Sequence, residues 1–154
     1  MAGEARRLTK AEINELLATA IVARLATVKP DGAPYVAPVW QHWDGEAMWI
    51  IPREWSSFVT NIAHESRVAV SCADDLDAGH RRVLIEGTAE VVEGPSVMAG
   101  HTLEIAKEMV RRYMGPDGVR YLTETSDRPR YLVRVTPGRI TSWRGGQWHR
   151  RYYA

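Results

Sequence analysis

The sequence is poor in cysteine and phenylalanine, with one of each, and it carries almost no net charge. Because Cys72 is the only cysteine, an internal disulfide and a cysteine-rich metal site are both excluded. Twenty Lys and Arg against nineteen Asp and Glu leave a formal charge of +1, which gives no reason to expect nucleic acid as a partner. No segment approaches the roughly 18 apolar residues of a membrane helix, and the charged N-terminus does not fit a signal peptide. We therefore expect a cytoplasmic protein without a membrane anchor.

The sequence also lacks the residue patterns of several enzyme classes. Its five histidines are scattered, with none paired at the spacing of a metal site, so no metal ion is expected. It has no glycine-rich strand-to-helix motif and no Walker motif, which argues against those two kinds of nucleotide site. The pattern therefore assigns no catalytic residue. What the sequence does have is six Trp and six Tyr, whose polar ring atoms favour half-exposed clefts and interfaces over a dry core.

The N-terminal segment predicts a helix followed by a β-hairpin. Thr9 and Glu12 have the spacing of a capping box, and the apolar residues behind them predict a helix over about 10–19. Two strands follow, over 20–28 and 33–43. They are joined by Lys-Pro-Asp-Gly, which is a tight-turn sequence.

A second turn sequence, Trp-Asp-Gly-Glu, leads into a third strand over 47–52. Three consecutive strands of this kind predict an antiparallel meander. Pro34 and Pro38 in the middle strand each remove a backbone donor from the hydrogen-bond ladder. We therefore expect that strand to lie at an edge, or to carry a bulge or kink.

The rest of the chain alternates between strands and helices without a regular rhythm. The pattern predicts a helix over 56–65, strands over 67–73 and 81–93 with a bulge at Gly87, a helix over 96–114, and a final hairpin of 131–137 and 139–145 around Pro137 and Gly138. This gives about seven strands and three helices. We predict one domain over 1–154, of the mainly β (α+β) class, with an antiparallel barrel and flanking helices.

The stretch Arg-Glu-Trp-Ser-Ser-Phe, which follows the third strand, has residues that could hold a phosphate. A helix N-terminus has free N–H groups and a partial positive charge, and Ser56 and Ser57 would add hydroxyl donors there. Arg53, at the end of the preceding strand, could supply a bidentate cation. The same residues also fit an N-capping serine beside a surface arginine, so the residues by themselves leave both interpretations open.

Four phrases in the sequence carry a family resemblance. They are "LATVKPDGAPYVAPV", "NIAHESRVAVS", "LIEGTAEVVEG" and "YLVRVTPGRITSW", in this order along the chain. Together they resemble the pyridoxamine 5′-phosphate oxidase-like flavoproteins over most of the sequence. The resemblance implies a split β-barrel and a homodimer with FMN, or alternatively a deazaflavin, at the dimer interface. It also implies an oxidoreductase that transfers hydride between the cofactor and a small oxidised substrate.

The same resemblance implies which residues hold the cofactor. Its phosphate is implied to lie against Arg53, Ser56 and Ser57. Its ring is implied to lie along Val39, Trp40, Gln41, Ile50 and Ile51. The short helix carries Asn61, the first residue of the family's Asn-hydrophobic pair. A C-terminal arm over about 143–154 is implied to close the site of the other protomer, through Trp143, Arg144 and Trp148.

The chain departs from the family pattern at one place. Members that bind FMN well usually have a lysine, often with an adjacent arginine, where this chain has Phe58 and Ser57. The loss of one charge-assisted phosphate contact weakens binding by about 1.5–3 kcal/mol. Two alternatives to an FMN enzyme therefore stay open, namely a deazaflavin-dependent reductase and a non-catalytic binding protein that has lost tight flavin affinity.

Overall fold

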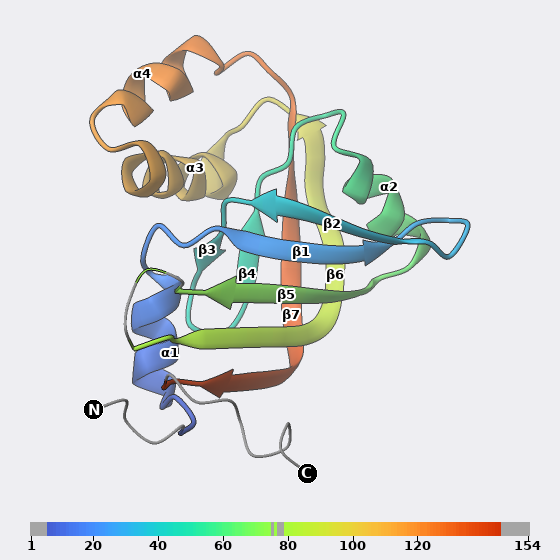
Figure 1. The fold of residues 1–154 in the computed structure, drawn as a ribbon. Coiled ribbons are helices and arrows are strands. Elements are labelled where there is room, and N and C mark those ends of the chain that lie inside the picture. Colours follow the sequence, from blue (N-terminus) through green and yellow to red (C-terminus); the bar gives the residue numbers. More distant parts are fainter. Residues whose placement is uncertain (1–5, 75, 77–78, 146–154) are drawn as a thin grey trace.

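The fold is built on one antiparallel sheet of seven strands, with four helices around it (Figure 1). The computed structural model describes residues 6–74, 76 and 79–145. In spatial order the strands are β2 (Pro34–Val39), β1 (Ala23–Val28), β5 (Arg67–Ala73), β6 (Arg82–Ser96), β7 (Arg130–Trp143), β4 (Met48–Ile50) and β3 (His42–Trp43). The helices are α1 (Lys10–Leu17), α2 (Ser57–His64), α3 (Gly100–Met114) and α4 (Asp117–Glu124). The predicted class, mainly β with flanking helices in a split-barrel-like fold, is confirmed.

Two long, bent strands, β6 and β7, hold the sheet together. In Figure 1 both run across the lower part of the molecule and then turn upward, so that β1, β2 and β5 face β3 and β4 across the interior. The largest fully buried side chains, among them Leu25, Met48 and Ile85, fill that interior. A second, smaller apolar cluster joins Ile105 and Met109 of α3 to Leu132 of β7. Among the described residues, no helix is long and apolar enough to cross a membrane.

Several local predictions are confirmed. α1 begins after Thr9 with the reciprocal capping box to Glu12, and it ends at Leu17, two residues before the expected end. The Asp31 carboxylate accepts the Ala33 N–H in the turn between β1 and β2, as the Pro-Asp-Gly sequence predicts. The bulge at Gly87 is present, since the pairing of β6 with β7 shifts register between Glu86 and Gly87.

The predicted final hairpin is wrong, because β7 runs unbroken from Arg130 to Trp143. Pro137 lies opposite Gly87, and Gly138 is the extra residue on the β7 side of the bulge. A bulge is one of the few places where a strand tolerates proline, since the missing N–H costs no ladder bond there. The Pro-Gly pair therefore bends one strand and does not reverse the chain.

The predicted second strand, 33–43, divides into β2 and β3, which lie at opposite edges of the sheet. β2 pairs with β1, whereas β3 pairs with β4. The simple three-stranded meander is therefore wrong, while the expected edge position of Pro34 and Pro38 is confirmed. The break falls at Trp40 and Gln41.

The helical layer above the sheet differs from the prediction in two ways. α3 begins at Gly100, four residues later than predicted, because β6 continues to Ser96. α4 was not predicted at all, and it begins only three residues after the end of α3. A Cβ at Gly118 would collide with the Val110 carbonyl, so glycine is what lets α4 pack closely on α3.

Candidate functional site

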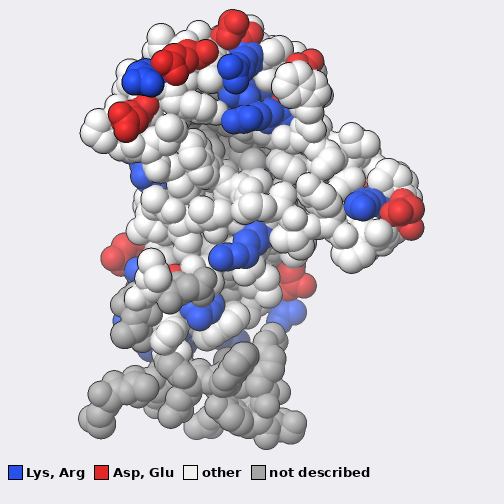
Figure 2. Space-filling view, turned by 45° about the horizontal axis from the view of Figure 1, so that its top comes forward, with Lys and Arg blue, Asp and Glu red and all other residues white. Residues whose placement is uncertain are grey.

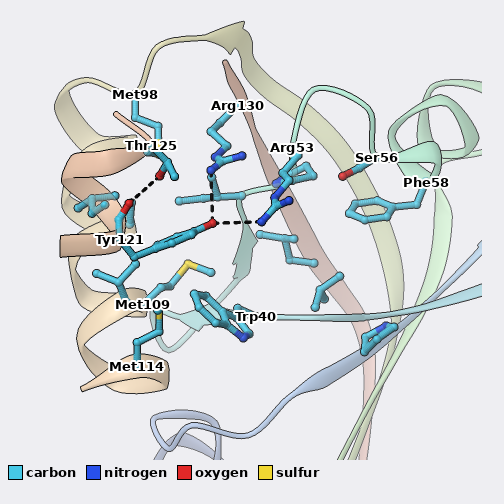
Figure 3. Close-up of a pocket in the computed structure, with 18 residues that line it drawn as sticks. Trp40, Arg53, Ser56, Phe58, Met98, Met109, Met114, Tyr121, Thr125 and Arg130 are labelled. Carbon is cyan, nitrogen blue, oxygen red and sulfur yellow. Dashed lines mark hydrogen bonds between the residues drawn. The ribbon is translucent and has the colours of Figure 1, made fainter. Parts of the chain in front are cut away.

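A cavity of about 500 Å³ lies between the sheet and the α3–α4 layer. This volume is in the range of small-molecule and cofactor sites. Most of its wall is apolar, and it draws on β2, the segment after β4, α2, α3, α4 and the start of β7 (Figure 3). Figure 2 shows a hollow below the upper helices with Lys and Arg side chains above it and mostly uncharged surface around it.

The polar end of the cavity holds two arginines that converge on one phenol. Arg53 Nη2 donates to Tyr121 Oη at 3.4 Å, and Arg130 Nη2 donates to the same oxygen at 3.5 Å. Arg53 is exposed at the rim, whereas Arg130 is only 7 % exposed. The backbones of the two arginines form an antiparallel bridge, which places their side chains together (Figure 3). This end of the cavity is therefore strongly cationic.

The same end also holds the N-terminus of α2. Ser56 is the N-cap residue and lines the cavity, but its side chain makes no capping hydrogen bond. Its hydroxyl is therefore not committed to the helix. Phe58, 6 % exposed, forms part of the cavity wall nearby.

The opposite wall is aromatic and apolar. The indole of Trp40 stacks on Tyr113 with a centroid distance of 5.0 Å and an interplanar angle of 2°, and it meets the edge of Tyr121 at 6.4 Å. Tyr113 is itself fixed, because its hydroxyl donates to the Ile21 carbonyl at 2.6 Å and accepts the Gln41 N–H at 3.2 Å. Burial raises the pKa of Tyr113, which keeps the hydroxyl protonated. The Trp40 ring is therefore held in one orientation before any ligand arrives.

The structure brings together six of the residues named in advance. Arg53, Ser56, Val39, Trp40, Ile50 and Ile51 all line the cavity.

Other named residues lie off the cavity wall. Gln41 is fully buried, with its Nε2 donating to the Leu17 carbonyl at 2.7 Å. Asn61 is buried and donates to the Thr27 hydroxyl at 2.9 Å. Ser57 begins α2 and is exposed. Gln41 and Asn61 are therefore part of the protein interior, and Ser57 lies on the surface.

The C-terminal residues named in advance lie at the far end of β7. Trp143 pairs with Arg82, and Arg144 contacts Glu12 at 3.3 Å. Both are remote along β7 from Arg130, which lines the cavity at the other end of that strand. Trp148 and the rest of the expected arm lie outside the described residues.

Two polar residues of the site, Arg130 and Tyr121, were missed in the sequence. Arg130 begins the last strand, and Tyr121 lies in the unpredicted α4. The sequence did contain a signal for Arg130, because a cation that directly precedes an apolar strand lies at the end of the sheet where that strand begins. Only the pairing of chain segments far apart in sequence shows that this end meets Arg53.

Metal and thiol chemistry find little support in the described part of the chain. It contains no cluster of three or more His, Cys, Asp or Glu side chains able to hold a metal ion. Cys72 is buried, and burial raises its pKa to about 12, so its thiolate is strongly disfavoured. The chemically distinctive features of the described residues are the cationic end and the aromatic wall of one cavity.

Comparison with known proteins places this fold in a known group. The family model described as "Pyridoxamine 5′-phosphate oxidase" matches residues 9–144. A conserved hypothetical protein, Rv2991 from Mycobacterium tuberculosis, is 29 % identical with a TM-score of 0.72, over 89 % of this chain and 85 % of that one. A protein described as F420 reductase is 26 % identical with a TM-score of 0.63, over 82 % of this chain and 94 % of that one.

More distant likenesses concern the fold alone. The haem storage protein HutZ from Vibrio cholerae is 21 % identical with a TM-score of 0.64, over 88 % of this chain and 94 % of that one. None of the curated proteins matches the chain.

Proposed function

Because the chain belongs to the pyridoxamine 5′-phosphate oxidase family, we propose that it is an oxidoreductase that binds FMN or a deazaflavin in the cavity below α3 and α4. The observation that carries this proposal is the joining of a fixed aromatic wall and a cationic end in one cavity. A flavin-type cofactor has a flat ring and an anionic tail, and these two parts need those two surfaces. The F420 reductase among the similar structures is the reason for keeping the deazaflavin beside FMN.

At the ring end, Trp40 and the apolar side chains orient the cofactor and exclude water. Trp40 is immobilised by its stack on Tyr113, so it can pack against a ring without losing rotamer freedom on binding. Met109 and Val110 of α3 also line the cavity and are both buried. The Gln41 backbone N–H donates to the Tyr113 hydroxyl and is therefore not available to a ring.

At the tail end, Arg53 and Ser56 bind the phosphate. A guanidinium offers two parallel N–H donors to a phosphate, and the uncommitted Ser56 hydroxyl adds a third. A bound flavin or deazaflavin would supply the redox chemistry by accepting and returning a hydride, so the protein's part is to bind, orient and shield it. No triad or metal is required for that role.

The proposal is tested by titrating the purified, cofactor-free protein with FMN and with the deazaflavin while following their fluorescence. Saturable binding at micromolar concentration or below is expected for one of them. Arg53→Gln should weaken it by about 10- to 100-fold, as expected for one charge-assisted phosphate contact. Arg128→Gln is the matched control, because Arg128 is exposed and does not line the cavity. If neither cofactor binds the unmutated protein, the alternative of a non-catalytic protein without flavin affinity replaces the proposal.

We also propose that the protein is a homodimer in which Trp143 and Arg144 of one protomer approach the cavity of the other. Support comes from their position at the end of β7 far from their own cavity, and from Trp55, which lies two residues after Arg53 and is 84 % exposed. An exposed tryptophan favours a partner surface. Sedimentation equilibrium measures the mass directly, and a monomer at the concentrations used for cofactor binding would contradict the dimer.

A further inference from the structure

The cationic end of the cavity contains charged hydrogen-bond donors that have no carboxylate acceptor among the described residues. Arg53 and Arg130 both donate to the Tyr121 oxygen, at 3.4 and 3.5 Å, which are long distances for charged donors. Within the described part of the chain, neither guanidinium forms an ion pair with a carboxylate. The Tyr121 O–H likewise donates to no acceptor among those residues. Two full positive charges and a phenol proton therefore face the cavity unneutralised (Figure 3).

Burial makes this arrangement unfavourable without a ligand. Arg130 is only 7 % exposed, so most of the water that would solvate its charge has been removed. A buried cation without a counter-ion destabilises a folded protein, and the effect grows when a second cation lies beside it. Exposed arginines of this chain form ion pairs, such as Arg111 with Glu108 at 2.6 Å and Arg120 with Glu124 at 3.0 Å. Arg130 is the one arginine that is buried among the described residues, and no carboxylate of those residues pairs with it. The buried Arg130 without a carboxylate partner among the described residues points to a counter-ion supplied by a ligand.

We propose that Arg53, Arg130 and Tyr121 form a subsite for a group that carries two negative charges, with Arg130 as its buried half and the Tyr121 O–H as a third donor. This inference rests on the proposed function and specifies its ligand. A single negative charge would leave one of the two cations uncompensated, whereas two charges neutralise both. A phosphate monoester meets this need near pH 7, because its second pKa is about 6. A phosphodiester together with a carboxylate of the same tail meets it as well.

These two kinds of anionic group belong to the two candidate cofactors: the phosphate monoester to FMN, and the phosphodiester with a carboxylate to a deazaflavin with an anionic tail. In both cases the discriminating quantity is the ratio between the affinity of the charged cofactor and that of its uncharged analogue. Riboflavin is the analogue of FMN, and the deazaflavin without its tail is the analogue of the other. The ring contacts are the same within each pair, so the ratio isolates what the subsite contributes.

The experiment measures this ratio by fluorescence titration for the unmutated protein and for Arg130→Gln, Tyr121→Phe and Arg128→Gln. Arg130→Gln should lower the ratio by about 10- to 100-fold, since one charge-assisted contact is lost. Tyr121→Phe should lower it by about 3- to 10-fold, since one hydrogen bond is lost. Arg128→Gln should leave it unchanged. An unchanged ratio in Arg130→Gln, with both cofactor and analogue still binding, would overturn the subsite and leave the proposed function intact.

A second measurement does not depend on flavin binding. Without ligand, Arg130→Met should melt at the same temperature as the unmutated protein or above it, because an uncompensated buried charge has been removed. Inorganic pyrophosphate should raise the melting temperature of the unmutated protein and not that of Arg130→Met. If no flavin binds but pyrophosphate still stabilises through Arg130, the proposed function fails and the subsite survives. If pyrophosphate has no effect and Arg130→Met is destabilised, Arg130 has a purely structural role and the inference is wrong.

Discussion

Replacing Tyr113 by Phe tests whether the aromatic wall is held in place by the end of α3. The Tyr113 hydroxyl joins three chain segments, because it donates to the Ile21 carbonyl at 2.6 Å and accepts the Gln41 N–H at 3.2 Å. The ring also stacks on Trp40 at 5.0 Å. Phe keeps the stack and removes both hydrogen bonds, so the substitution separates the polar contribution from the aromatic one.

The expected cost follows from the groups left without partners. Gln41 is fully buried, and its backbone N–H loses its acceptor in the variant. The Ile21 carbonyl loses a short hydrogen bond at the same time. Leaving a buried polar group unsatisfied costs about 1–3 kcal/mol. We therefore expect the free energy of unfolding to fall by about 1–3 kcal/mol, and the melting temperature to fall by about 2–4 °C for each kcal/mol in a chain of this length.

Thermal unfolding followed by circular dichroism measures this difference, with Tyr131→Phe as control. Tyr131 packs against the core, and its hydroxyl has no partner among the described residues. Removing that hydroxyl should therefore change the melting temperature little. Burial raises the pKa of Tyr113, so the folded state holds that proton more tightly than the unfolded state. Stability should therefore fall as the pH rises above about 10, and less so in the Phe variant. Equal melting temperatures for Tyr113→Phe and the unmutated protein would refute the proposed role of the hydroxyl.

Three further predictions concern the scaffold. Gly87→Ala should lower the free energy of unfolding, measured by denaturant titration, by about 1–3 kcal/mol, because the new Cβ would press on the Thr136 carbonyl. Gly138→Ala is the control, and it should lower the free energy of unfolding less, because its nearest contact is at 3.4 Å. Cys72, buried and with a pKa raised to about 12, should not react with a thiol reagent at neutral pH until the protein unfolds, and rapid labelling of the native protein would contradict this placement. Hydrogen bonds from Arg6 and the Thr9 backbone hold the pKa of Glu12 well below its usual range. The ionised Glu12 therefore contributes to stability above a pH of about 4.3, and this contribution is lost on acidification. Glu12→Gln should flatten the fall in melting temperature between pH 5 and pH 3, and an unaltered pH profile would exclude this role.

Features that depend on short-range interactions could be predicted from the sequence. The capping box of Thr9 and Glu12 involves residues within one turn, and the structure has it as expected. The bulge at Gly87 was predictable because glycine in the interior of a strand packs poorly unless the backbone approaches closely. Arg53 and Ser56 could be named as candidate phosphate ligands because both lie within a few residues of one helix N-terminus. Their placement on the cavity wall follows from that local geometry.

The misjudged features share a different cause. Pro137 and Gly138 have the composition of a turn, but their long-range pairing with β6 makes them a bulge inside β7. α4 forms because Gly118 allows it to pack on α3, and a helix of only eight residues is not stable without such a tertiary contact. In both cases tertiary packing decided the structure, and the local sequence did not.

The sequence by itself therefore determined the class of the fold, the family and half of the proposed anion subsite, since these are encoded in local patterns and in the order of elements. Only the tertiary structure decided that Arg130 and Tyr121 face Arg53. The reason is physical: the three residues lie on β7, on α4 and after β4, and what brings them together is the pairing of strand ends and the docking of one helix on another. The free energy of those contacts comes from the burial of apolar surface across the whole sheet. No short stretch of sequence determines that burial.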